Sequence, residues 1–253
     1  MRTAVVTGAS SGIGESTARR LGRDGWRLVL VARRQERLDA LTRELPDAAP
    51  VAVDLTDDDA PRRLRAAVDE TLGGRLELLV NNAGMSERAR FGEEGGGYAN
   101  VRKIMELNFD SVVRLTEELL PVLRASAPSA IVNVASVAGR VSYPTGGAYS
   151  ASKFALAGWT EALSQEEAPN GVHVGMVLPG YVATEGFPQT DLTARRATRW
   201  IVSTPEKVAE AVVRAGPGGR HEVVVPRGYG VVPVLRALAP GVVRRVTSRM
   251  ERG

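Results

Sequence analysis

Seven short apolar runs, rich in Val, Leu and Ala, recur along the chain, and longer segments of helical periodicity lie between them. Strands that are apolar on both faces are typical of parallel sheets, in which helices cover both sides. The pattern predicts an α/β fold, a doubly wound parallel sheet of about seven strands in three α/β/α layers. The expected strands are TAVVT (3–7), RLVLVA (27–32), VAVD (51–54), LELLVN (76–81), AIVNVAS (130–136), VHVGMVL (172–178) and EVVVP (222–226). The expected helices begin near Gly12, Gln35, Asp57, Asn100, Tyr149 and Pro205.

No linker-like stretch or internal repeat divides the chain, and the glycine-rich GEEGGGY (92–98) is too short for a domain boundary. We therefore expect a single domain over residues 1–253. Within it, residues 185–202 lack a strand pattern, and residues 228–253 form an amphipathic tail.

Composition excludes several classes of protein. The 33 basic and 29 acidic residues are interspersed, and no basic block alternates with aromatic residues, so we expect no nucleic-acid partner. No apolar stretch approaches the ~20 residues that span a bilayer, and the N-terminus shows no secretory signal pattern. Without cysteine, and with only His173 and His221, which we interpret as surface strand residues, we expect no metal site. These features favour a cytoplasmic protein.

The first expected strand ends in TGASSGIG, in which Gly8, Gly12 and Gly14 open a helix. Glycine allows a tight turn and a close approach of a ligand to the backbone, while the helix N-terminus offers free N–H groups to a pyrophosphate. A strand-to-helix turn also needs glycine for steric reasons alone. Its position after the first strand nevertheless favours a dinucleotide site.

The second expected strand runs into Arg33 and Arg34 rather than into an acidic residue. An acid at this position accepts the ribose hydroxyls of NAD, whereas arginine suits the 2′-phosphate of NADP. The alternative is that both arginines are ordinary surface charges at the start of a helix. We predict NADP(H) as the preferred cofactor, with NAD(H) as the alternative.

The stretch YSASK places Lys153 four residues after Tyr149, in a chain whose 33 basic residues include only three lysines. Residues four apart on a helix share a face. A free tyrosine titrates near pH ~10, and a nearby positive charge lowers that pKa toward neutrality. The alternative is that Lys153 is a solvated charge on a helix surface.

Between about Thr3 and Pro226 the chain resembles the short-chain dehydrogenase/reductase family, in its single-domain oxidoreductase branch. The motifs that carry the resemblance are TGASSGIG, VDL (53–55), NNAG (81–84), Asn108, Ser136, YSASK and PGYVAT (179–184), in the family's order and spacing. The resemblance implies a Rossmann-like fold, a small carbonyl or alcohol substrate, and a homodimer or homotetramer.

The resemblance also assigns roles to individual residues. Tyr149 would be the general acid and base, Lys153 its partner and a ligand of the nicotinamide ribose, Ser136 a donor to the substrate oxygen, and Asn108 part of a proton relay. Asp54 would meet the adenine, Asn82 the adjoining ribose, and Thr184 the nicotinamide end. The other expected cofactor contacts are Ser10, Ser11, Ile13, Leu55, Ala83, Gly84, Pro179, Gly180 and Val182. Donors from Ser136 and Tyr149 would stabilise the negative charge that hydride transfer builds on a carbonyl oxygen.

Each of these residues also has a purely structural interpretation. Ser136 could end a strand, Asp54 could cap a helix, and Asn81 and Asn82 could be turn residues. Asn108 lies within a helical pattern (RKIMELNFDSVVRL), where asparagine is ordinarily a neutral surface choice. Three of the chain's six asparagines fall on the motif positions, which favours the functional interpretation.

In the family, the region after PGYVAT closes over the substrate. Phe187 and Trp200 from this segment, with Met85, Tyr143 and Tyr181 from other loops, would form an apolar pocket beside Ser136 and Tyr149. We predict a medium-sized, largely apolar carbonyl compound or alcohol, with reduction as the physiological direction.

The tail (231–250) places Val231, Leu235, Leu238, Val242 and Val246 near helical spacing, with arginines between them. We predict that this stripe packs on the domain or on a neighbouring subunit. The alternative is a basic helix that lies on an anionic membrane surface.

Altogether the sequence predicts an NADP(H)-dependent oxidoreductase that interconverts a ketone or aldehyde with an alcohol. An NAD-linked alcohol dehydrogenase of the same family is one alternative. A cofactor-sensing regulatory protein without turnover is another, although such proteins commonly lose the acid/base pair, which this chain retains.

Overall fold

The computed structural model describes residues 2–185 and 201–249. Seven parallel strands form one sheet in the order β3-β2-β1-β4-β5-β6-β9. This confirms the predicted doubly wound sheet, because the order reverses between β1 and β4. The strands are β1 (Thr3–Thr7), β2 (Arg27–Ala32), β3 (Ala48–Ala52), β4 (Leu78–Asn81), β5 (Ser129–Val134), β6 (Val172–Pro179) and β9 (Glu222–Val225).

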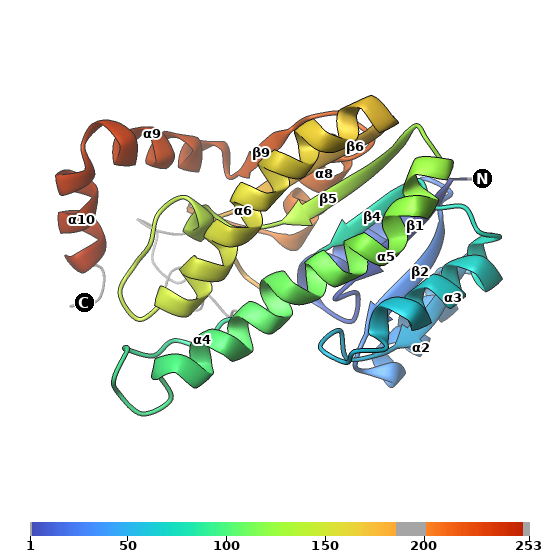
Figure 1. The fold of residues 1–253 in the computed structure, drawn as a ribbon, viewed down its shortest axis with the longest axis horizontal. Coiled ribbons are helices and arrows are strands. Elements are labelled where there is room, and N and C mark those ends of the chain that lie inside the picture. The colour runs from blue at the N-terminus through green and yellow to red at the C-terminus, as the bar shows by residue number, and fades with distance from the viewer. Residues whose placement is uncertain (1, 186–200, 250–253) are drawn as a thin grey trace.

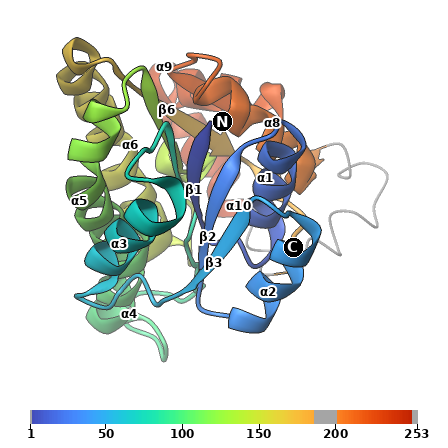
Figure 2. The same cartoon turned by 90° about the vertical axis from the view of Figure 1, so that its right-hand side faces the viewer.

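Helices cover both faces of the sheet (Figures 1 and 2). They are α1 (Gly12–Arg23), α2 (Gln35–Glu44), α3 (Ala60–Leu72), α4 (Gly97–Met105), α5 (Ser111–Ala125), α6 (Gly147–Glu167), α8 (Pro205–Ala215), α9 (Val231–Leu238) and α10 (Pro240–Arg249). Helices α1, α2 and α8 pack on one face, and α3, α5 and α6 pack on the other. Alternate residues of each strand enter the two cores: in β1, Val6 points into the first core and Val5 into the second.

Several predicted boundaries move by a few residues. The third strand ends at Ala52 rather than at Asp54, and the following helix begins at Ala60 rather than near Asp57. A two-stranded ribbon that the sequence did not predict pairs β7 (Tyr181–Val182) with β8 (Val202–Ser203). Its strands are only two residues long, too short to show an alternating pattern.

Two predicted helical stretches are interrupted. A π-helical turn, Glu106–Asp110, separates α4 from α5, and such turns are frequent at functional sites. The tail is not one helix, because it breaks at Ala239, directly before Pro240, whose ring is tolerated only in the first turn of a helix.

Candidate active site

The turn between β1 and α1 requires glycine. Gly8 and Gly12 have φ angles of +67° and +56°, which side chains rarely tolerate. A Cβ atom at Gly14 would lie 2.1 Å from the carbonyl oxygen of Gly8. The glycines therefore allow the tight turn that places the N-terminus of α1 beside the end of β1, the arrangement in which helix N–H groups can bind a pyrophosphate. Thr184 lies over this turn, since a Cβ at Gly12 would lie 3.1 Å from its side chain.

Asn82 and Thr7 hold the ends of β1 and β4 together beside the turn. The Asn82 amide donates to the carbonyl oxygen of Thr7 at 2.9 Å. The Thr7 hydroxyl accepts the backbone N–H groups of Asn82 and Ala83 at 2.9 and 3.0 Å. Asn82 thus has a structural role in addition to its predicted contact with ribose. Asn81 is not a turn residue: it ends β4, is buried, and donates to Asn133 at 2.9 Å.

The two arginines after β2 lie beside the glycine turn. The Arg34 guanidinium donates to the hydroxyls of Ser10 and Ser11 at 3.1 and 2.9 Å. It also pairs with Glu185 at 3.3 Å. The arrangement gathers a guanidinium and two hydroxyl groups, all able to donate to an anion, at the edge of the turn.

Arg33 lies 3.6 Å from the carboxylate of Asp54. Asp54 also accepts the backbone N–H and the hydroxyl of Thr56 at 3.0 and 2.8 Å. Burial raises the pKa of Asp54, but these hydrogen bonds and the Arg33 charge outweigh it and hold the pKa below its ordinary value. Asp54 does not cap α3, which begins six residues later. The side chain of Leu55, a predicted cofactor contact, packs into the core.

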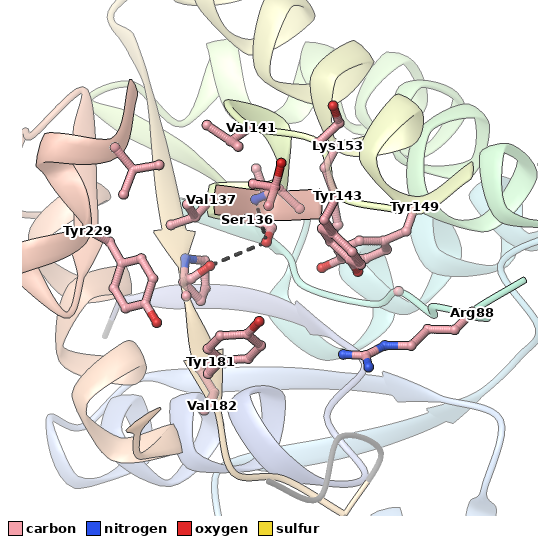
Figure 3. A pocket seen from close by; sticks show the side chains of 18 of the residues that line it. Arg88, Ser136, Val137, Val141, Tyr143, Tyr149, Lys153, Tyr181, Val182 and Tyr229 are labelled. Atoms are coloured by element: carbon pink, nitrogen blue, oxygen red, sulfur yellow. Dashed lines mark hydrogen bonds between the residues drawn. The ribbon is translucent and has the colours of Figure 1, made fainter. Parts of the chain in front are cut away.

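Ser136, Tyr149 and Lys153 meet beyond the carboxyl end of β5 (Figure 3). The Ser136 hydroxyl accepts the N–H of Ala138 at 3.1 Å and donates to the carbonyl oxygen of Pro179 at 3.3 Å. Burial raises the pKa of Tyr149 to about 12, and a hydrogen bond with Ser136 opposes the rise. The sequence-based expectation of a lowered Tyr149 pKa is therefore wrong for the protein chain itself. Desolvation of the phenolate outweighs its neighbours because the ring is buried.

Lys153 is not a solvated charge: its residue surface is 4% exposed, and its Nζ donates to the carbonyl oxygen of Val134 at 2.9 Å. Nζ lies 5.9 Å from the centre of the Tyr149 ring. Burial lowers the pKa of Lys153 to about 8, so the ammonium form still predominates at neutral pH. Gly139 lets this part of α6 approach, since a Cβ there would lie 2.5 Å from the carbonyl oxygen of Lys153.

Asn108 lies in the π-helical turn and is fully buried, so the interpretation as a neutral surface residue is wrong. Its side chain accepts the N–H of Met85 at 2.8 Å and donates to the carbonyl oxygen of Met85 at 2.9 Å. It also donates to Ser152 at 3.0 Å. Gly84 lies between Asn108 and Lys153, because a Cβ on it would be 3.1 Å from the Asn108 Oδ1 and 3.6 Å from the Lys153 Nζ.

Ser136, Tyr149 and Lys153 line a cavity of about 490 Å³, whereas Asn108, Arg33, Arg34 and Asp54 are not among its lining residues. Of the residues predicted from sequence, the cavity brings together Ile13, Asn82, Gly84, Met85, Ser136, Tyr143, Tyr149, Lys153, Pro179, Gly180, Tyr181, Val182 and Thr184. Phe187 and Trp200, which were predicted for the same pocket, lie outside the described residues. The cavity is thus a mainly apolar space with hydroxyl groups near its centre (Figure 3).

Sequence reasoning missed several lining residues. Tyr229 packs against Gly180, where a Cβ would lie 2.8 Å from its ring. Its position soon after β9, at the edge where parallel strands end, was a usable signal. Arg88, Val137 and Val141 also line the cavity. So do Leu235, Val242 and Val246 of α9 and α10, which belong to the apolar stripe that the sequence predicts to pack on the domain or on a neighbouring subunit.

His173 differs from its predicted role as a surface strand residue. It is half-buried in β6, and its Nε2 lies 2.9 Å from the carbonyl oxygen of Ala215. Within residues 2–185 and 201–249, no group of three or more His, Cys, Asp or Glu side chains is placed to hold a metal ion. None of the helices described there is long and apolar enough to cross a bilayer.

Comparison with known proteins places this geometry in a family. The model of the short chain dehydrogenase family matches residues 2–194. The ketoacyl reductase HetN of Nostoc sp. is 33% identical over 228 residues, which cover 88% of this chain and 78% of that protein. The putative ketoacyl reductase of the monensin polyketide synthase from Streptomyces virginiae is 38% identical over 195 residues, which cover 72% of this chain and 71% of that protein.

Comparison with solved structures leads to the same family. A short-chain dehydrogenase from Streptomyces avermitilis superposes with a TM-score of 0.79 at 30% identity, covering 98% of both chains. The RhlG/NADP active-site complex of Pseudomonas aeruginosa has a TM-score of 0.79 at 29% identity, covering 90% of this chain and 96% of that one. The chain therefore belongs to the short-chain dehydrogenase/reductase family, whose members are oxidoreductases that bind NAD(P).

Proposed function

We propose that this protein is an NADP(H)-dependent reductase that converts a medium-sized, largely apolar ketone or aldehyde into an alcohol. The observation that carries the proposal is the pair of hydrogen-bonded hydroxyls of Ser136 and Tyr149, beside the buried Lys153, in a cavity that reaches the glycine turn. A carbonyl oxygen bound beside both hydroxyls would gain two donors as its negative charge develops, once the Ser136 proton turns toward it from the Pro179 carbonyl oxygen.

The reaction divides between cofactor and protein. When bound, the nicotinamide supplies the hydride. Ser136 and Tyr149 hold the carbonyl oxygen, and the Tyr149 hydroxyl donates a proton to it. The Lys153 ammonium stabilises the resulting phenolate, with its Nζ held in place by the Val134 carbonyl oxygen. Asn108 fixes the backbone at Met85, next to Gly84, and so shapes the wall beside Lys153.

The pKa of Tyr149 favours the reductive direction. Because burial raises it to about 12, Tyr149 holds its proton at neutral pH and begins the reaction as an acid. Oxidation of an alcohol would need the phenolate at the start, which burial disfavours.

Preference for NADP(H) is supported by the donors at the edge of the turn. Arg34 with Ser10 and Ser11 would hold a 2′-phosphate, and Arg33 beside Asp54 would flank it. The glycine turn at the N-terminus of α1 supports a dinucleotide at the same place, because helix N–H groups there can bind its pyrophosphate. The NADP complex of RhlG, a structural neighbour, points the same way.

Titration with NADPH and NADH tests this preference. Substitutions Arg34→Asp and Arg33→Asp should each weaken NADPH binding about 10- to 100-fold, since a charge-assisted contact contributes ~1.5–3 kcal/mol, while NADH binding changes little. Arg43→Asp, at an exposed position of α2, is the control. Equal loss for both cofactors, or no loss, would contradict the NADP preference.

The apolar lining supports a substrate with few charges, and the two relatives named as ketoacyl reductases are consistent with an acyl-type carbonyl compound. Oxidation of NADPH, followed at 340 nm over a carbonyl panel, is the direct test. Tyr149→Phe should lower kcat on the best substrate by about 10²- to 10⁴-fold. Tight NADPH binding without turnover on any carbonyl compound would instead favour a cofactor-sensing protein.

We further propose that residues 1–253 act as a single domain in the cytoplasm, where NADPH is supplied, and as a homodimer or homotetramer. Family membership supports the assembly. Sedimentation of the purified protein would test it directly.

A further inference from the structure

Helices α9 and α10, residues 231–249, form what we call the C-terminal arm. The arm follows the carboxyl end of β9 and projects from the body of the molecule (Figure 1). It lies outside the stretch that the family model matches, residues 2–194. The family model therefore carries no information about this segment.

One face of the arm is a wall of the candidate active-site cavity. Val232 and Leu235 of α9, with Val242, Val243 and Val246 of α10, line the cavity that also holds Ser136 and Tyr149. The cavity is thus continuous from the hydroxyl pair to the arm.

The arm is held to the body by one residue in particular. The Arg236 guanidinium donates to the carbonyl oxygen of Arg140 at 2.8 Å and lies 4.8 Å from the centre of the Phe154 ring. Both contacts fix α9 against structure that flanks the cavity, since Phe154 belongs to α6, the helix of Tyr149 and Lys153. The part of the wall on α9 therefore has a defined position relative to the hydroxyl pair, and α10 packs against α9.

Part of the apolar surface of this wall is exposed to solvent. Leu235, Val242 and Val246 line the cavity but are still 46%, 59% and 55% exposed. Apolar surface of this kind gains from being covered by an apolar ligand. Among the described residues that line the cavity, none is acidic, and only Arg88 and Lys153 are basic. Figure 3 shows Arg88 and Tyr229 on opposite sides of the hydroxyl pair, and the arm continues from the Tyr229 side.

We propose that the C-terminal arm binds the apolar chain of the substrate, so that the protein reduces carbonyl compounds with a long alkyl or acyl chain and selects them by length. This inference rests on the proposed reductase function, and it names the substrate class of the same site. The carbonyl lies at Ser136 and Tyr149, and the chain lies against Val242 and Val246. The arm residues are determinants of specificity rather than catalytic residues.

A series of methyl ketones from 2-butanone to 2-decanone tests the proposal with the full-length protein and NADPH. For the wild type, kcat/KM should rise by up to about fourfold for each added methylene, because burying one contributes ~0.8 kcal/mol. Val246→Asp should flatten this dependence. Val246→Phe, which fills part of the wall, should move the optimum to a shorter ketone. Leu238→Asp is the matched control, since Leu238 is on the arm and 80% exposed but does not line the cavity; it should keep the wild-type dependence.

Fluorescence of cis-parinaric acid gives a second readout that needs no turnover. The wild type and Leu238→Asp should bind this probe, and Val246→Asp should bind it at least tenfold more weakly. Turnover of short ketones by the wild type with no dependence on chain length would overturn the proposal and leave the reductase function intact. Absence of turnover on every ketone would count against the reductase function, and parinaric acid binding would then decide the arm's role alone.

A second copy of the chain as the partner of the arm is distinguished in the same experiments. Sedimentation of the wild type and of both aspartate variants reports whether the arm binds a second copy of the chain. If Leu238→Asp and Val246→Asp both dissociate an oligomer and neither changes the dependence on chain length, the wall is a subunit interface and the proposal is overturned.

Discussion

Burial of Lys153 should cost the protein stability at neutral pH. Its residue surface is 4% exposed, and burial moves the pKa of its ammonium group from 10.5 to about 8. A difference of about 2.5 pH units corresponds to ~3 kcal/mol, at about 1.4 kcal/mol for each unit. A methionine at this position has similar length and carries no charge. The variant Lys153→Met therefore isolates the cost of the charge.

The sign of the pH dependence follows from proton binding. Below about pH 8 the lysine is charged in both the folded and the unfolded protein, so the full cost of burial applies. Between about pH 8 and 10.5 the folded protein has lost this proton while the unfolded chain still binds it. Stability rises with pH wherever the unfolded state binds more protons, so the wild type gains stability relative to Lys153→Met across this interval.

Urea denaturation of wild type and Lys153→Met between pH 7 and 10.5, without cofactor, measures this difference. The free energy of unfolding of the wild type, minus that of the variant, should increase by ~3 kcal/mol over the interval. Tyr149 and Tyr229, whose pKa values burial raises to about 12, keep their protons in both folded proteins over this interval, so their contributions cancel. The variant should also lose most of its reductase activity, because the phenolate of Tyr149 loses its neighbouring charge. If this difference in the free energy of unfolding stays constant to within about 0.5 kcal/mol across the pH interval, burial does not lower the pKa of Lys153 and the reasoning is refuted.

Four further variants test the same geometry. Gly14→Ala should lower the free energy of unfolding by ~1–3 kcal/mol and weaken cofactor binding, because its Cβ would lie 2.1 Å from the Gly8 oxygen. Gly158→Ala, in α6 with open space around it, should stabilise the protein by up to ~1 kcal/mol in the same urea assay. Asn108→Leu should cost ~1–3 kcal/mol, seen as a lower Tm, because it leaves the partly buried N–H and carbonyl oxygen of Met85 without their partner; an unchanged Tm would contradict this. Absorbance titration at 295 nm of the wild type and of Tyr149→Phe identifies the Tyr149 phenol as the group that titrates only in the wild type. We expect this group to titrate near pH 12. If it titrates below pH ~10 instead, the Lys153 charge outweighs burial.

Much of the fold was predictable because it depends on local patterns. The near-continuous apolar runs require cover on both faces, so the seven-stranded parallel sheet followed from them. The incorrect predictions concern the ends of helices and strands and the places where a helix is interrupted. The π-helical turn around Asn108 and the break before Pro240 arise where tertiary packing or a single proline overrides a helical period that the sequence otherwise continues.

Some residues of the candidate site were likewise predictable from the sequence, and others were not. Ser136, Tyr149 and Lys153 were predicted as a group, and the structure brings all three to one cavity. Tyr229 and the C-terminal arm were not predicted for the cavity, because no periodicity or spacing reports which distant segment closes a pocket. The direction of the Tyr149 pKa was also predicted wrongly, since spacing on a helix reveals the neighbouring charge but not the depth of burial.

The order of strands and helices along the chain and the glycine turn were determined by the amino-acid sequence itself, because each depends on residues close together in the chain. The sequence also indicated the candidate reacting side chains, through motifs in the family's order and spacing. Burial, proton affinity and the shape of the cavity were decided only by the tertiary structure. Desolvation of Tyr149 and Lys153, and the wall that Val242 and Val246 form opposite them, arise from contacts between segments that folding alone brings together.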